Sequence, residues 1–178
     1  SYSGAAYIYE RDTNGTWTQV AFLKASDVDD GNYFGTSVAI SGDYAIIAAY
    51  NEDTVANGSG AAYIFERDTN GTWTETQILK ASNAAANVQL GRGSSGVAIS
   101  GDYAIVGCFS EDTTESNSGA AYIFERDTTT GIWGTAVSGQ SYYNENQMLK
   151  ASNADDGNDV QFGWSVAISG DYAIVGAR

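Results

Sequence analysis

The chain carries the stretch Ser37-Val38-Ala39-Ile40-Ser41-Gly42-Asp43-Tyr44-Ala45-Ile46, and it repeats this stretch twice more with few changes, at residues 96–105 and 165–174. A second phrase, Gly-Ala-Ala-Tyr-Ile, begins at Gly4, Gly60 and Gly119, and a third, Leu-Lys-Ala-Ser, begins at Leu23, Leu79 and Leu149. Three phrases that recur three times in one order indicate three copies of one structural unit. A period of several tens of residues is typical of propellers and other repeat arrays.

The repeats divide the chain into three units, at residues 1–50, 51–109 and 110–178, which we interpret as one continuous repeat domain. Apolar and polar residues alternate with a period of two at the start of each unit, which predicts β-strands. In the first unit we expect four strands, at residues 5–11, 16–25, 37–41 and 44–49. The predicted fold is all-β, with three tandem four-stranded antiparallel units of the β-propeller-blade type.

The third and fourth strands of each unit are short, apolar and rich in Ala and Gly, so we expect them in the interior. The first two strands carry charges and are expected at the periphery. Asn14-Gly15 and Asn70-Gly71 separate these two strands, and such pairs favour a type I′ hairpin turn. The third unit has an insertion at residues 133–146, which we expect in a hairpin tip or an outer strand.

The charge balance, with 8 Lys and Arg against 22 Asp and Glu, argues against nucleic acid as a partner. No apolar run is long enough to insert into a membrane. The single cysteine, Cys108, takes a position held by Ala49 and Ala177 in the other units, so we expect a buried structural thiol.

Six of the eight basic residues fall at two repeated positions, and we interpret them as surface ion pairs between the first two strands of each unit. They are Arg11, Arg67, Arg126, Lys24, Lys80 and Lys150.

Catalytic residues are not predicted, and we expect no enzymatic activity. The chain has no histidine, which removes the usual general base near neutral pH. Two carboxylate pairs, Glu52-Asp53 and Glu111-Asp112, recur in sister loops, and this recurrence favours a role in the loops over glycoside hydrolysis.

The sequence predicts no cofactor and no metal site, and calcium is the one ion for which it offers weak candidate ligands. Two acidic loops could contribute oxygen ligands, although the matching loop of the second unit, which begins at Asn83, has no carboxylate. The candidate residues are Asp27, Asp29, Asp30, Asp155, Asp156 and Asp159.

Three Asn-x-Ser/Thr sequons begin at Asn14, Asn57 and Asn70, all in predicted turns where a glycan would be tolerated. The alternative is that Asn-Gly occurs there only as a turn dipeptide.

The recurring Phe34-Gly35, Leu90-Gly91 and Phe162-Gly163, with the later small-residue segments at 48–50, 107–109 and 176–178, resemble FG-GAP repeats of integrin α-subunit propellers. The resemblance covers essentially the whole chain and implies four-stranded antiparallel blades around an axis, in an extracellular or cell-surface protein. The calcium-binding turn of integrin-like repeats is shortened here to Ser41-Gly42-Asp43, so that site is not carried over.

From this resemblance we expect an extracellular or cell-surface module for adhesion or for recognition of a protein or glycan. The candidate recognition patch comprises Tyr142, Tyr143 and Trp164. Two alternatives stay open: a structural subunit of an extracellular fibre or sheath, and the accessory propeller of a larger surface enzyme. Three units are fewer than a closed ring requires, so we expect either association with further copies or a place in a longer repeat chain.

Overall fold

The computed structural model describes residues 3–27, 29–113, 118–153 and 160–178, and all the regular structure in these ranges is β-strand. No helix in these ranges is long and apolar enough to cross a membrane. The presence of strands alone among the regular elements of these ranges confirms the predicted all-β fold. The strands are β1 (Ala6–Arg11), β2 (Trp17–Leu23), β3 (Phe34–Ser41), β4 (Tyr44–Ala49), β5 (Ala61–Arg67), β6 (Trp73–Lys80), β7 (Val97–Ser100), β8 (Tyr103–Cys108), β9 (Ala120–Glu125), β10 (Thr135–Ala136), β11 (Tyr142–Asn144), β12 (Gln147–Leu149), β13 (Ser165–Ser169) and β14 (Tyr172–Gly176).

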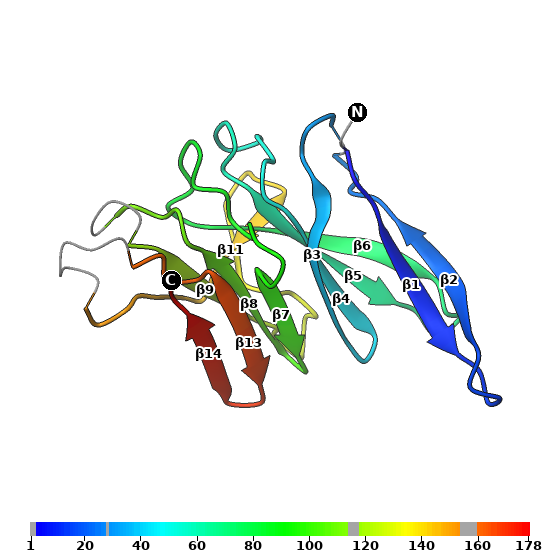
Figure 1. The fold of residues 1–178 in the computed structure, drawn as a ribbon. Helices are drawn as coiled ribbons and strands as arrows, with labels where there is room; N and C mark the ends of the chain where they lie inside the picture. Colours follow the sequence, from blue (N-terminus) through cyan, green and yellow to red (C-terminus); the bar gives the residue numbers. More distant parts are fainter. Residues whose placement is uncertain (1–2, 28, 114–117, 154–159) are drawn as a thin grey trace.

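The strands form a row of four sheets that stand face to face (Figure 1). The first hairpin, β1–β2, lies at one end of the row and the last hairpin, β13–β14, lies at the other. Between them stand a six-stranded sheet with the order β10-β11-β6-β5-β4-β3 and a four-stranded sheet with the order β12-β9-β8-β7. The strands β3, β7 and β13 contact one another in sequence and form the inner side of the array.

The sheets are offset by half a unit from the sequence repeats. In the six-stranded sheet, β3 and β4 come from residues 1–50, whereas β5 and β6 come from residues 51–109. The same exchange occurs in the next sheet, where β8 pairs with β9. A complete blade therefore joins the last two strands of one unit to the first two strands of the next.

In the two larger sheets, the first strand of a unit lies outward of the third and fourth strands, as expected, but this position does not leave it exposed. The strands β5 and β9 are buried along most of their length, because each lies between two neighbours within a sheet. Among the first strands β1, β5 and β9, only β1, which has a partner on one edge, is mostly exposed.

The hairpin turns differ from the predicted type I′ form. Gly15 has a positive φ of 88°, whereas Asn14 is not among the residues with positive φ. The Asp12 side chain accepts hydrogen bonds from the amides of Asn14 and Thr16, at 2.9 and 2.8 Å. Asp68 holds the second hairpin turn in the same way. The turn is thus fixed by an aspartate at its start and a left-handed glycine at its end, as in three-residue hairpin loops.

The insertion of the third unit builds the short hairpin β10–β11, and β11 pairs in parallel with β6 of the preceding sheet. It therefore covers the outer edge of a neighbouring blade, consistent with the expected outer location. This pairing protects the β6 edge, which would otherwise present unpaired backbone groups.

The recurring Phe-Gly pair is explained by a close approach between adjacent sheets. Phe34 is buried, with its ring edge-on to Tyr63, and Gly35 has a φ of 93°. A Cβ atom at Gly35 would lie 2.4 Å from the carbonyl oxygen of Ala5. A Cβ atom at Gly163 would likewise lie 2.1 Å from the carbonyl oxygen of Ala120. Only glycine fits both the backbone conformation and the space.

Candidate recognition surface

We call β3–β4, β7–β8 and β13–β14 the inner hairpins. A line of aromatic and arginine side chains crosses one end of them. Tyr33, which directly precedes β3, stacks on Tyr50, which directly follows β4, with ring centroids 5.0 Å apart. The Arg92 guanidinium carbon lies 5.8 Å from the centroid of the Tyr50 ring and 5.3 Å from that of Phe109. One cation therefore links aromatic rings of two neighbouring blades.

The line continues into the last hairpin. Phe109 directly follows β8 and Trp164 directly precedes β13, and the centroids of their rings are 4.6 Å apart. The Arg178 guanidinium carbon lies 4.7 Å from the centroid of the Trp164 ring. We call this set the aromatic–arginine row; its members are Tyr33, Tyr50, Arg92, Phe109, Trp164 and Arg178.

The row combines exposed arginines with rings that are partly accessible, except for Phe109, which is buried. Arg92 and Arg178 are exposed, Tyr33 is 38% exposed, and Tyr50 and Trp164 are half-buried. Burial raises the pKa of Tyr50, and nearby Tyr33 raises it further, so its hydroxyl stays protonated at neutral pH. Such a surface offers flat apolar faces beside positive charge.

The structure separates the residues of the predicted patch. Trp164 belongs to the row on the inner side, whereas Tyr142 and Tyr143 lie on β11, at the outer side of the six-stranded sheet. Tyr143 packs against the core between the two large sheets, so it is partly committed to the fold.

The other members of the row were missed because no single unit contains the pattern. A signal was nevertheless present in the repeats. The residues that directly follow each Phe/Leu-Gly pair are Thr36, Arg92 and Trp164, and these differ although their neighbours repeat. Equivalent positions after the inner hairpins hold Tyr50, Phe109 and Arg178.

The prediction that the repeated lysines form surface ion pairs is wrong for Lys80 and Lys150. The Lys80 side chain is 1% exposed and its ammonium contacts the Glu52 carboxylate, which is 2% exposed. Burial lowers the pKa of Lys80 to about 8. Lys150 contacts Glu111 at the equivalent position and is 19% exposed. The glutamates lie after β4 and β8 and the lysines lie at the ends of β6 and β12, so each pair joins two segments of one sheet.

These contacts also give the recurring carboxylate pairs a place in the loops. Glu52 and Glu111 are the lysine partners, and Asp53 accepts a hydrogen bond from the Gly58 amide at 2.7 Å. The arrangement fits the interpretation that these carboxylates hold the loops.

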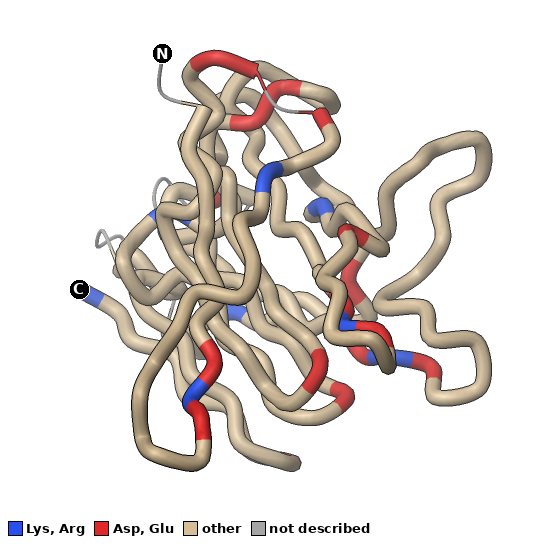
Figure 2. Tube along the Cα trace, turned by 90° about the vertical axis from the view of Figure 1, so that its right-hand side faces the viewer, with Lys and Arg blue, Asp and Glu red and all other residues tan. Residues whose placement is uncertain are grey.

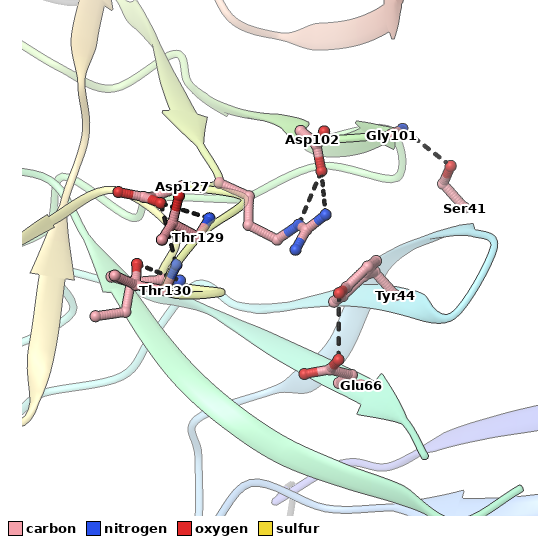
Figure 3. A network of polar contacts seen from close by, with 10 residues as sticks. Ser41, Tyr44, Glu66, Gly101, Asp102, Asp127, Thr129 and Thr130 are labelled. Carbon is pink, nitrogen blue, oxygen red and sulfur yellow. Dashed lines mark hydrogen bonds and ion pairs between the residues drawn. The ribbon is translucent and has the colours of Figure 1, made fainter. Parts of the chain in front are cut away.

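The repeated arginines bind the turns that join inner strands. Arg126 forms an ion pair with Asp102 of the β7–β8 turn (Figure 3). The Arg67 guanidinium lies 3.6 Å from the Asp43 carboxylate of the β3–β4 turn. In both cases the arginine amide also donates to the aspartate carbonyl oxygen, at 2.8 Å. Each pair thus joins the two halves of one blade.

Of the calcium candidates, Asp27 accepts a hydrogen bond from the Tyr63 hydroxyl at 2.8 Å. Among residues 3–27, 29–113, 118–153 and 160–178, no group of three or more Asp, Glu, Cys or His side chains could hold a metal ion. Asp29 and Asp30 are exposed, and Asp155, Asp156 and Asp159 lie outside the described residues.

Asn14, Asn57 and Asn70 are all exposed, as a glycan acceptor requires, and their modification stays a prediction.

Most charged residues lie in the turns and loops at the strand ends (Figure 2). Cys108 is fully buried, as expected, and burial raises the pKa of its thiol, which disfavours the reactive thiolate.

A family model of the FG-GAP repeat matches residues 17–65, 73–124 and 143–178, which together make up most of the chain. The matched segments include all three Phe/Leu-Gly pairs and all three inner hairpins. No curated protein sequence matches the chain.

Proposed function

Since this chain belongs to the FG-GAP repeat family and is a β-propeller-type repeat module, we propose that it is a non-catalytic recognition module. In this proposal the module works outside the cell or at its surface, in adhesion or in binding a protein or glycan. Repeats of this family are typical of extracellular-type domains, and the three exposed sequons are compatible with such a location.

The observation that carries the proposal is the aromatic–arginine row. Aromatic residues and arginine are enriched at the energetic centres of binding interfaces, because they combine large apolar faces with directional donors. Arg92 and Arg178 are exposed, so the row presents two positive charges on a chain with a net charge of −14. A ligand with carboxylate or sulfate groups beside apolar rings or sugar faces would complement this surface.

A binding screen tests the proposal. The chain would be titrated against immobilised neutral, uronate-bearing and sulfated oligosaccharides and against acidic aromatic peptides. For any hit, we expect Trp164→Ala and Arg92→Ala each to weaken binding at least about tenfold, the size expected for a hot spot.

Trp17→Ala is the matched control. Trp17 is 62% exposed but lies on β2, outside the row, so its loss should leave binding unchanged. Equal losses from Trp17→Ala and Trp164→Ala, or binding that survives both row variants, would contradict the proposal.

A further inference from the structure

A pocket of about 330 Å³ lies where the loop after β2, the six-stranded sheet and the insertion of the third unit meet. Ser26 and Asp27 of the loop, residues of β6, and Ser141 and Tyr142 of the insertion all contribute to its lining. Its volume lies within the range of about 300–1,000 Å³ that small-molecule sites occupy. The residues that line it do not belong to the aromatic–arginine row, so it is a separate candidate site.

The ammonium group of Lys80, which also lines this pocket, has hydrogen-bond donors that the fold does not fill. An ammonium carries three N–H donors, and that of Lys80 contacts the Glu52 carboxylate. Among the residues that the structure describes, the nitrogen has no further acceptor. The side chain is only 1% exposed, and leaving buried donors unfilled is costly. A molecule in the pocket that offers an acceptor would remove this cost.

The equivalent lysine of the next blade shows what Lys80 lacks. Lys150 contacts its glutamate partner and also lies 3.4 Å from the Ser118 hydroxyl. Ser59 takes the place of Ser118 in the preceding unit, but its hydroxyl donates to the Glu52 carbonyl oxygen at 3.3 Å. The repeat therefore supplies a second polar partner to Lys150 and none to Lys80.

Asp27, on the loop side of the pocket, presents acceptors where the next unit has a donor. Its carboxylate accepts a hydrogen bond from the Tyr63 hydroxyl at 2.8 Å. At the equivalent position Asn83 accepts from a tyrosine and also donates to Glu111, each at 2.8 Å. An ionised carboxylate has no hydrogen to donate, so Asp27 cannot make that second contact. A group that both accepts and donates would join Lys80 to Asp27.

The charges around the pocket disfavour an ionic ligand. Glu52, Asp27 and Glu75 carry negative charges against the single positive charge of Lys80, so an anion would be repelled. Within the described ranges no group of three or more Asp, Glu, Cys or His side chains could hold a metal ion, and an organic cation would bring no acceptor to Lys80. Neutral hydroxyl groups accept and donate, and therefore meet both requirements.

The insertion adds an aromatic side chain to these polar groups. Tyr142 on β11 pairs with Ile78 on β6, and both residues line the pocket. A tyrosine ring offers an apolar face beside a polar hydroxyl. The insertion occurs once in the sequence, so this combination is made at the first blade junction and is not repeated at the second.

We propose that this pocket binds one neutral sugar residue, with a sugar hydroxyl between Lys80 and Asp27 and the C–H face of the ring against Tyr142. A sugar ring carries adjacent hydroxyls on its edge and apolar C–H groups on its face, the two features that the pocket combines. The site does not involve the aromatic–arginine row, so it stands whether or not that row binds a ligand.

NMR titration of the full chain with glucose, galactose, mannose and N-acetylglucosamine tests the proposal. We expect saturable binding of at least one of them at millimolar concentration, with a shift of the Lys80 Cε resonance and a smaller shift at Lys150, the equivalent lysine. Glucuronate, which adds a negative charge, should bind at least about tenfold more weakly than glucose. If none of the four neutral sugars binds saturably, water alone fills the pocket and the proposal is overturned. Glucuronate binding as well as glucose would overturn the charge argument.

Two variants test the polar and the aromatic contact separately. Asp27→Asn introduces the residue that the next unit carries, so it should fold and weaken binding severalfold. Tyr142→Ala should weaken binding about tenfold, with the fold checked by urea unfolding. Tyr9→Ala is the matched control, because Tyr9 is an exposed tyrosine on β1 outside the pocket. Trp164→Ala should also leave sugar binding unchanged, which separates this site from the row. Equal losses from Tyr9→Ala and Tyr142→Ala, or binding that survives both pocket variants, would contradict the proposal.

Discussion

The buried lysine–glutamate pairs should contribute to stability in proportion to their burial, and the three units supply a matched series. Lys80, Lys150 and Lys24 occupy the same position in the repeat. The Lys80 side chain is 1% exposed, the Lys150 side chain is 19% exposed, and Lys24 is exposed, with a hydrogen bond to Ser3 at 3.2 Å. Replacing each lysine by methionine keeps most of its apolar volume and removes only its charge.

The expected losses follow from what each change leaves behind. Lys80→Met leaves the Glu52 carboxylate buried without its cation, which costs about 3–5 kcal/mol of the free energy of unfolding. Lys150→Met also leaves a buried carboxylate, Glu111, but Lys150 is itself partly solvated and Asn83 still donates a hydrogen bond to Glu111, so we expect about 1–3 kcal/mol. Lys24→Met should stay within about 0.5 kcal/mol of the parent chain. Removing both charges in Lys80→Met/Glu52→Leu should recover most of the Lys80→Met loss, because no unpaired buried charge remains.

Urea unfolding followed by tryptophan fluorescence measures these differences, with the slope of each transition checked for constancy. Equal losses in the three single variants, or a Lys80→Met chain as stable as Lys24→Met, would refute the reasoning that burial sets the cost. A double variant less stable than Lys80→Met alone would also refute it.

Three further predictions follow from single positions. Gly35→Ala should cost at least about 2 kcal/mol by urea unfolding, because φ is 93° and the new Cβ would meet the Ala5 carbonyl; Gly31→Ala, with φ of 97° and open space, should cost only about 1 kcal/mol, and equal costs would contradict the close-approach argument. Backbone hydrogen bonds from Thr72 and Asn70 lower the pKa of Asp68 below 3.8, so the stabilisation of this turn is present above pH 3.8 and is lost as pH falls through the lowered pKa. Amide exchange at Gly71 and Thr72, corrected for intrinsic pH dependence, should accelerate in that acidic range, and should be fast at all pH values in Asp68→Ala. Cys108 should react with a thiol reagent only as fast as the chain unfolds, and rapid reaction under native conditions would contradict its burial.

The elements that local sequence determines were predicted well. The predicted strand at residues 44–49 begins and ends where β4 does. The buried position of Cys108 followed from the alanines at the equivalent positions. The Phe-Gly pair indicated the family, and the structure supplies its physical reason in the approach of Gly35 to the Ala5 carbonyl.

Features that depend on contacts between units were not predicted. The sequence repeat has no preferred starting point, so the pairing of β4 with β5 across a unit boundary could not be read from it. Lys80 resembled a surface residue because lysine is seldom buried, and its partner Glu52 lies in a separate loop. The aromatic–arginine row is assembled from residues of all three units, each of which is unremarkable in its own segment.

The half-unit offset between sheets and sequence repeats is the central claim, because it decides which strands make up a complete blade. Nuclear Overhauser effects between backbone protons of Ile46 and its cross-strand neighbour test it most directly. We predict contacts of Ile46 with Ile64, its partner on β5 from the following unit. Contacts of Ile46 with Ile8, the equivalent residue within its own unit, in a monomeric sample would contradict the account.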